Sequence, residues 1–308
     1  MELIRGLQNI RPKHHGCVAT IGNFDGVHLG HQSVLGQLAE KAEELGLPTA
    51  LITFEPQPME YFIPDKVPAR LTRFREKILA LQRYSVDRVC CLSFNEKLAK
   101  LSAEAFIEEI LVGKLGVRYL VVGDDFRFGK NRAGTFDTLV EAGKQYGFHV
   151  VSMHTFEIDA ERVSSTRIRN ALENGEMANA EKLLGRRYRM SGRVAHGEKL
   201  GRELGYPTAN IHLHRHASPI QGIFVVEVFG LDEEPLQGVA SIGTRPTVNE
   251  TKALLEVYLL DFDQDIYGRH IQVSFLKKIR DEEKFNSLEE LVEKIDNDVE
   301  QAQAYFAA

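Results

Sequence analysis

The amino-acid sequence predicts two domains: an α/β domain with a parallel sheet in residues 1–185, and a mainly β domain in residues 186–308 that ends in a long helix. In the first domain, apolar strand patterns alternate with amphipathic helix patterns, which is typical of a parallel sheet with helices on both faces. After Arg186, short apolar strands are separated by glycine-bearing turns, without helices between them. That rhythm indicates an antiparallel barrel or sandwich.

The elements of the first domain follow from hydrophobic periodicity. In the first helix, Val34, Leu35, Leu38, Ala42 and Leu45 recur at helical spacing and are expected on one buried face. The expected strands lie at residues 16–24, 47–56, 86–94, 117–126 and 148–156, and the expected helices at 31–46, 73–85, 103–116 and 136–147.

The second domain begins after a helix that ends near Gly185. Its last segment, residues 287–306, reads as a helix opened by Ser287 with Glu290 three residues on, which is a capping-box pattern. The expected strands lie at residues 188–197, 222–230, 236–243, 253–262 and 270–280.

Composition excludes several classes of protein. Hydrophobic content of 43% and charged content of 27% are those of a soluble globular protein, and a net charge of −6 argues against a protein that coats nucleic acid. No apolar run approaches the roughly 20 residues that span a bilayer, and the N-terminus has no apolar signal region. Cys17, Cys90 and Cys91 form no disulfide framework or metal knuckle. We therefore expect a cytoplasmic protein with no membrane or nucleic-acid partner.

The stretch TIGNFDGVHLGHQ, residues 20–32, predicts an anion site. It follows an apolar strand, and ligands of open α/β sheets bind at the carboxyl ends of strands and at helix N-termini. His28 and His31 are three residues apart, which places both imidazoles on one side of the first helical turn. Gly22, Gly26 and Gly30 would let the backbone turn sharply and approach a ligand closely. Such a cluster suits phosphoryl or nucleotidyl transfer, although a lone histidine here would more often be a capping or surface residue.

Other phosphate and metal motifs fit this stretch poorly. A P-loop would need a following GKS or GKT, and a dinucleotide fingerprint would need the GxGxxG spacing. A zinc site would need more ligands nearby. The sequence HLGH is also similar to the HIGH motif of class I aminoacyl-tRNA synthetases, but the chain has no KMSKS-like block.

Several blocks in order resemble one family. GNFDGVHLGHQ (22–32), VVGDDFRFGKNRAG (121–134) and VSSTRIR (163–169) resemble the motifs of the nucleotidyltransferase domain of prokaryotic FAD synthetases. GEKLGRELGYPTANI (197–211) resembles the riboflavin kinase signature that ends in PTAN. The resemblance covers nearly the whole chain and identifies it as a member of the bifunctional riboflavin kinase/FMN adenylyltransferase family. It implies a Rossmann-like domain, then an antiparallel kinase barrel ending in a long helix.

The resemblance implies roles for residues of the first domain. Asn23 and both histidines would face the phosphates of ATP, and His28 and His31 are the expected catalytic residues. Ser164 or Ser165 would cap a helix whose Arg167 and Arg169 reach phosphates, although a plain capped helix with solvated arginines is the alternative. The nucleotide-binding set is Gly22, Asn23, Phe24, Gly26, Gly30, Ser164, Thr166 and Arg167. The flavin-binding set is Asp125, Asn131, Phe126 and Phe128, of which the two phenylalanines offer ring faces.

The second domain carries the implied kinase site. Thr208 and Asn210 offer hard oxygen ligands for Mg²⁺, and Glu256 interrupts an apolar strand, where an ionised group is costly unless it is used or paired. In the family the matching glutamate is the proposed base for the 5′-hydroxyl of the flavin; a glutamate on the wet face of the strand is the alternative. The resemblance assigns ATP binding to Lys199, Gly201 and Arg202, and flavin binding to Arg280, Glu282 and Phe285.

The family pattern is not matched everywhere, and other functions stay open. Gln57 stands where a histidine is usual, Tyr206 where phenylalanine is common, and Phe224 where tyrosine is common. The alternatives are a chain with only one of the two activities, a nucleotidyltransferase for another acceptor such as pantetheine phosphate, and a non-enzymatic flavin- or RNA-binding regulator. The expected ligands are riboflavin, FMN, FAD, ATP and Mg²⁺.

Overall fold

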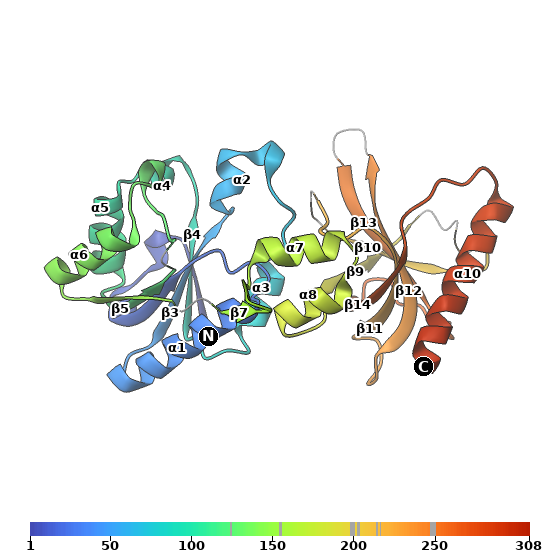
Figure 1. The fold of residues 1–308 in the computed structure, drawn as a ribbon, viewed down its shortest axis with the longest axis horizontal. Helices are drawn as coiled ribbons and strands as arrows, with labels where there is room; N and C mark the ends of the chain where they lie inside the picture. The colour runs from blue at the N-terminus through green and yellow to red at the C-terminus, as the bar shows by residue number, and fades with distance from the viewer. Residues whose placement is uncertain are drawn as a thin grey trace. The chain divides into compact units, whose positions relative to one another are not determined.

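The chain folds into two compact units (Figure 1). The computed structural model describes residues 1–123, 125–153, 156–197, 201, 204–213, 215, 217–246 and 251–308. The first unit comprises Met1–Val67 and Lys77–Val163, and the second comprises Pro68–Glu76 and Ser164–Ala308. Helices α7 (Ser165–Glu173) and α8 (Met177–Leu184), which precede the expected boundary at residue 185, cluster with the second unit, where α7 packs on α8 and α8 packs on the barrel.

The first unit is built on a six-stranded, fully parallel sheet of strand order β1-β4-β3-β2-β5-β6. The sequence pattern missed β1, which is only four residues long, and the short β7–β8 hairpin. The strands are β1 (Glu2–Arg5), β2 (Cys17–Ile21), β3 (Thr49–Glu55), β4 (Arg88–Ser93), β5 (Val117–Val122), β6 (His149–Ser152), β7 (Glu157–Ile158) and β8 (Glu161–Arg162).

Helices cover both faces of this sheet, as predicted. Neighbouring strand residues enter opposite cores: Leu51 packs with Val34 and Leu38 of α1, whereas Ile52 packs with Phe106 on the other face. The helices are α1 (Leu29–Leu45), α2 (Pro58–Phe62), α3 (Phe74–Leu81), α4 (Glu96–Ala99), α5 (Ala103–Ala105) with a π-helical continuation (Phe106–Lys114), and α6 (Phe136–Tyr146), joined by 3₁₀ turns at Leu7–Asn9, Pro12–His14, Pro64–Lys66 and Lys130–Arg132.

One residue of the expected buried helix face is exposed. Leu45 is 42% exposed, whereas Val34, Leu35, Leu38 and Ala42 are buried. Leu45 is the last residue of α1, and the chain reverses at once through Gly46 in the left-handed conformation. No further helical turn covers its side chain, so the prediction was wrong at this position.

The second unit contains a closed six-stranded barrel. Of the two architectures that the sequence left open, a barrel and a sandwich, the barrel is therefore the correct one. Antiparallel pairing runs β10-β13-β12-β11-β14-β9, and β9 pairs with β10 to close the ring. The strands are β9 (Arg189–Ala195), β10 (Thr208–His212), β11 (Gly222–Phe229), β12 (Leu236–Pro246), β13 (Thr251–Leu259) and β14 (His270–Arg280). Alternate side chains fill the interior, which includes Ile211, Phe224, Val226, Ala240, Ile242, Leu255, Val257 and Phe275.

The terminal helix α10 (Leu288–Ala307) lies along the outside of the barrel (Figure 1). Its residues Val299 and Ala302 pack on Ile223, Val225 and Val239. The Ser287 hydroxyl caps it by accepting from the N–H of Glu290 (3.2 Å). The reciprocal half of the predicted capping box is shifted, because the Glu290 carboxylate accepts from the N–H of Asn286 (3.0 Å).

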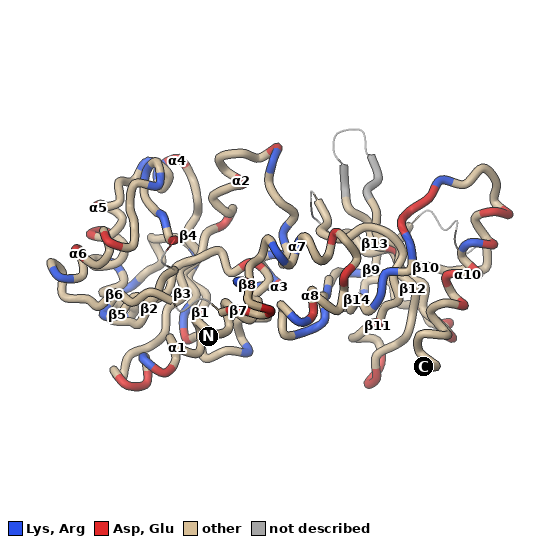
Figure 2. The backbone as a smooth tube through the Cα atoms, in the orientation of Figure 1, with Lys and Arg blue, Asp and Glu red and all other residues tan. Residues whose placement is uncertain are grey.

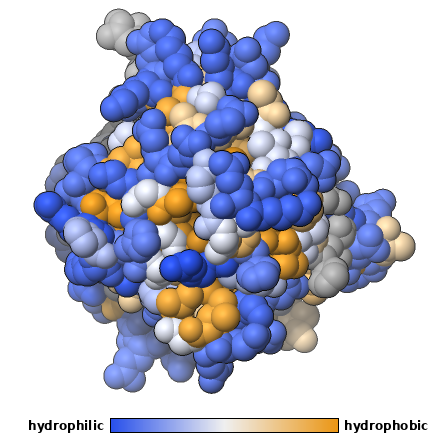
Figure 3. Space-filling model, turned by 90° about the vertical axis from the view of Figure 1, so that its left-hand side faces the viewer, coloured by the Kyte–Doolittle hydropathy of each residue, from blue (hydrophilic) through white to orange (hydrophobic). Residues whose placement is uncertain are grey.

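The surface mixes charge and apolar area. Basic and acidic residues are interspersed along the described parts of both units (Figure 2). Seen from the side of α5 and α6, apolar patches lie between hydrophilic side chains (Figure 3), which is ordinary for protein surfaces. Among the described residues, no helix has both the length and the apolar character that crossing a membrane requires.

Candidate active sites

The loop after β2 has a strained backbone. Phe24 (φ +49°), Gly26 (φ +85°) and Val27 (φ +42°) all have left-handed conformations, which are unfavourable for phenylalanine and more so for a β-branched valine. Of the three glycines expected to turn the chain, only Gly26 has a positive φ. An added Cβ at Gly30 would lie 3.2 Å from the His28 ring, so this glycine instead permits close approach. Strain of this kind is concentrated at functional sites.

The structure brings His28 and His31 together at the N-terminus of α1. His28 is the N-cap residue, and its Nδ1 accepts from the N–H of His31 (3.3 Å). The two rings stack with centroids 3.6 Å apart, and Phe24 packs against His31 at 4.7 Å. The positive end of a 17-residue helix lies beneath both imidazoles, which favours an anion here.

Two buried polar groups lie at the carboxyl end of β3, beside this loop. Gly22 donates to the carbonyl of Ile52 (3.0 Å), which places Thr53 next to the start of the loop. The hydroxyl of Thr53 and the amide Nε2 of Gln57 are buried without a hydrogen-bond partner in the described part of the chain. Buried polar groups without partners are rare, and a polar ligand would satisfy them.

The flavin-binding candidates of the first unit differ in exposure. The exposed Asp125 carboxylate pairs with Arg162 (3.0 Å), and Asn131 is exposed in a left-handed turn conformation. Phe126 and Phe128 stack at 5.6 Å, but Phe128 is only 7% exposed and also packs on Phe106 at 5.5 Å. Phe128 therefore has the environment of a core residue, and only Phe126 retains a partly exposed ring.

An exposed aromatic cluster was not anticipated. Tyr61, Phe62 and Phe94 meet edge to face with centroids 5.3–5.6 Å apart, and Met59 beside them is also exposed. The cluster lies at the ends of β3 and β4, where ligands of parallel sheets bind. The signal in the sequence was the pair of adjacent aromatic residues in MEYFI, which directly follows the prolines of FEPQP.

The SSTRIR block begins α7 in the second unit. Of the two serines proposed as cap, it is Ser164 whose hydroxyl accepts from the N–H of Arg167 (3.2 Å). Arg169 donates its Nε to the carbonyl of Ala69 (2.6 Å), so its side chain is held by backbone. Thr166 is exposed in the first turn, and Arg167 is half-buried.

The kinase candidates line one cavity of about 380 Å³ between the outer face of the barrel and α10. Lys199 and Arg202 lie outside the described residues. The predicted residues that line the cavity are Gly201, Thr208, Asn210, Glu256, Arg280, Glu282 and Phe285. Sequence reasoning missed Ser241, Tyr258 and Asp298, which also line it.

Strand register explains why the polar residues gather. Asn210 of β10 pairs with Glu256 of β13, which in turn pairs with Ser241 of β12. Directly opposed side chains on one sheet face lie about 4.5–5.5 Å apart at Cβ, so these three form a polar row across the barrel. Their neighbours along each strand point inward, which leaves Glu256 half-buried on the outer face.

Asn210 and Thr208 have the chemistry of a site for a hard cation. The Asn210 amide Nδ2 donates to the carbonyl (3.3 Å) and hydroxyl (3.5 Å) of Thr208, so its carbonyl oxygen is left for other partners. A Cβ added to Gly197 would lie 2.5 Å from Cγ of Asn210, so a larger residue at this position would displace the Asn210 side chain. No group of three or more His, Cys, Asp or Glu residues that could hold a metal exists among the described residues. A cation here would therefore rely on neutral oxygens, a carboxylate and ligand phosphates.

Two contacts tie α10 to the cavity wall. Arg280 donates Nε and Nη2 to the two oxygens of Asp298 (2.9 and 2.7 Å) and lies 5.8 Å from the Phe285 ring centroid. The Tyr206 hydroxyl donates to Asp296, and this hydrogen bond to a carboxylate raises the pKa of Tyr206 to about 12. The phenol therefore stays protonated through the neutral range and keeps this contact.

Replacing Asp298 tests the first of these ties. The Asp298 side chain is only 4% exposed, and Asp298→Asn removes the charge that holds the Arg280 guanidinium. Removing one partner of a buried ion pair costs about 3–5 kcal/mol, so we expect a large fall in thermal stability. Asp281→Asn, at an exposed carboxylate paired with Lys278, is the matched control and should change little. Equal melting temperatures for the two variants would contradict the assignment.

The parallel α/β unit with paired histidines and the barrel with a carboxylate-lined cavity define a class of two-domain, nucleotide-dependent transferases. The FAD synthetase family model matches residues 10–167, and the riboflavin kinase family model matches residues 184–306. The bifunctional riboflavin kinase/FMN adenylyltransferase of Escherichia coli (strain K12) is 51% identical over 307 residues, covering 99% of this chain and 98% of that protein. The protein of that name from Pseudomonas fluorescens is 52% identical over 308 residues, covering 100% of this chain and 98% of that protein.

The chain therefore belongs to the bifunctional riboflavin kinase/FMN adenylyltransferase family. Kinases and FAD synthetases of these families use ATP and typically a divalent metal ion. A crystal structure titled as a macrolide-efflux protein from Streptococcus pneumoniae is also similar, with a TM-score of 0.82, 31% identity, and coverage of 98% of this chain and 99% of that one. What it shares with this chain is the fold.

Proposed function

We propose that this chain makes FAD from riboflavin in two steps. Residues 186–308 transfer the γ-phosphoryl group of ATP to riboflavin, giving FMN and ADP. Residues 1–185 then transfer the AMP moiety of a second ATP to FMN, giving FAD and pyrophosphate. The observation that carries the proposal is the cavity in which Glu256 lies in one register row with Asn210.

In the kinase step, the oxygen of the terminal ribityl hydroxyl attacks the γ-phosphorus of ATP, and ADP leaves. Glu256 takes the proton of that hydroxyl. Thr208 and Asn210 are proposed to hold Mg²⁺, which when bound would offset charge on the phosphates. Arg280 and Phe285 form the wall against which the flavin ring binds, together with Glu282. Lys199, Gly201 and Arg202 are proposed to bind ATP.

In the adenylyl step, a phosphate oxygen of FMN attacks the α-phosphorus of ATP, and pyrophosphate leaves. His28, His31 and the N-terminus of α1 stabilise the charge that develops on the phosphate oxygens, together with the neighbouring loop residues. The N-terminus of α7, with Ser164, Thr166 and Arg167, is also proposed to bind phosphate. Neither step needs a protein nucleophile.

Flavin binding in the first unit is proposed for Asp125, Phe126 and Asn131. The aromatic cluster of Tyr61, Phe62 and Phe94 offers a second surface for stacking, because Tyr61 and Phe62 are exposed at the ligand-binding edge of the sheet. We do not retain Phe128, because its ring packs in the core. We also propose a cytoplasmic location, which fits the three buried cysteines, because they form no disulfide bond in the described part of the chain.

A single time course tests the two steps. The purified chain would be incubated with riboflavin, ATP and Mg²⁺, and riboflavin, FMN and FAD would be separated chromatographically. We expect FMN to appear first and then give way to FAD. FMN that accumulates without FAD would show a chain with kinase activity alone. No turnover from either riboflavin or FMN would overturn the proposal and leave a binding protein.

A further inference from the structure

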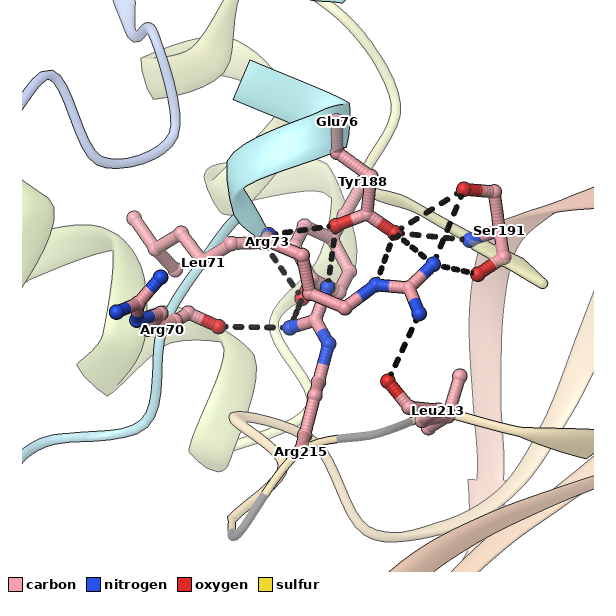
Figure 4. Close-up of polar contacts among 8 residues, drawn as sticks. All are labelled: Arg70, Leu71, Arg73, Glu76, Tyr188, Ser191, Leu213 and Arg215. Carbon is pink, nitrogen blue, oxygen red and sulfur yellow. Dashed lines mark hydrogen bonds and ion pairs between the residues drawn. The ribbon is translucent and has the colours of Figure 1, made fainter. Parts of the chain in front are cut away.

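The segment Pro68–Glu76 belongs to the second unit, although it lies far from the barrel in sequence and within the range matched by the FAD synthetase family. Figure 4 shows how it is held: Arg73 and Glu76, at the start of α3, point toward Ser191 of β9 and toward the chain that follows β10. None of the reaction steps above uses these side chains.

Glu76 is the centre of the network. Its Oε1 accepts from the N–H (3.1 Å) and the hydroxyl (3.2 Å) of Ser191, and its Oε2 accepts from Arg215 (2.7 Å) and from the N–H of Arg73 (2.7 Å). The Glu76 side chain is only 10% exposed and that of Arg215 only 3%. Arg215 also donates to the carbonyl of Arg70 (2.7 Å), which fixes the segment at a second point.

Arg73 links β9 to the residue that directly follows β10. Its Nη1 donates to the carbonyl of Leu213 (2.9 Å), its Nη2 donates to the carbonyl of Ser191, and it pairs with Glu76 at 3.2 Å. A planar guanidinium reaches these acceptors together, whereas a lysine ammonium could not satisfy the same geometry. The network therefore sets the spacing between β9 and the end of β10.

These two strands carry the proposed cation site. Leu213 directly follows β10, which contains Thr208 and Asn210. β9 pairs with β10 at Ala195 opposite Asn210, and Gly197 just beyond β9 packs against the Asn210 side chain. A shift of β9 against β10 would therefore move the oxygens of Asn210 and Thr208 relative to Glu256 on β13.

We propose that Arg73 and Glu76 are positioning residues for the riboflavin kinase reaction, holding β9 and β10 so that Thr208 and Asn210 are correctly placed for the metal–ATP complex. The inference rests on the proposed kinase function. It assigns to that reaction two residues from the part of the sequence that resembles the adenylyltransferase.

The test uses the full-length chain carrying Arg73→Lys or Glu76→Gln. Both substitutions should shift Thr208 and Asn210 by a fraction of an ångström. We therefore expect the KM for ATP in FMN formation to rise by about tenfold, and the half-saturating Mg²⁺ concentration to rise by about the same factor. The KM for riboflavin and the rate of FMN-to-FAD conversion should change less than about twofold, because neither depends on this strand spacing. Glu44→Gln, at an exposed carboxylate paired with Lys41, is the matched control.

Circular dichroism and thermal melting would establish which variants fold. If Glu76→Gln does not fold, Arg73→Lys, which keeps the charge, decides the question. Unchanged ATP and Mg²⁺ dependence in a folded variant would overturn the inference, as would equal loss of both activities. Wild-type protein that forms no FMN would instead overturn the proposed function itself.

Discussion

Glu256→Gln is expected to stop FMN formation while FMN is still converted to FAD. Glutamine keeps the shape of the side chain and its place between Asn210 and Ser241, but it cannot accept the proton of the ribityl hydroxyl. Loss of a general base typically lowers a rate by about 10²–10⁴-fold, and we expect kcat for riboflavin phosphorylation to fall in that range. Initial rates with riboflavin and, separately, with FMN would measure the two steps.

The control for this variant is another glutamate of the same barrel. Glu234 is exposed between β11 and β12, and Glu234→Gln removes one negative charge without touching the cavity. It should leave both rates unchanged. If Glu256→Gln kept most of its kinase activity with an unaltered melting temperature, Glu256 would be a glutamate on a wet strand face, and the base would have to be sought elsewhere in the cavity.

The sequence predicts those residues of the kinase site that strand periodicity marks. Glu256 stood out because it interrupts an apolar strand. Tyr258 was missed, although period-2 alternation places it on the same face of the strand as Glu256. Ser241 and Asp298 were missed because a serine in a strand and an aspartate in a helix carry no local signal. Their role follows from register and from the packing of α10, which join positions remote in sequence.

The same limit applies to the Arg73–Glu76 network. The sequence correctly predicts a helix at this point, but periodicity reports only which face of a helix is buried, not which polar groups meet. The contacts of Glu76 with Ser191 and Arg215 span more than a hundred residues.

In the first unit, Phe128 was predicted to bind flavin but packs in the core. From the sequence, a phenylalanine beside a polar loop fits a ligand-binding residue and a core residue equally well. Only the contact of Phe128 with Phe106 distinguishes these two roles.

His28→Ala is expected to impair the second step strongly and spare the first. Removing one preorganised group that stabilises transition-state charge typically costs about 10²–10³ in rate, so FAD formation from FMN should fall by that factor while riboflavin phosphorylation is unchanged. His28 is also the N-cap of α1, and losing a cap costs about 0.5–2 kcal/mol of stability. Lower FAD formation by His28→Ala would therefore not show whether His28 acts in catalysis or only caps α1. A second variant is needed.

His28→Asn separates the two roles. Asparagine is among the best N-cap residues, so this variant should regain the melting temperature of the wild type, yet it lacks the imidazole that stacks on His31. We expect it to remain as inactive in FAD formation as the alanine variant, whereas His149→Asn, at an exposed strand position of the same unit, should be fully active. Recovery of FAD formation together with stability would mean that His28 only caps α1, and that the charge on the phosphates is stabilised by the helix N-terminus and His31.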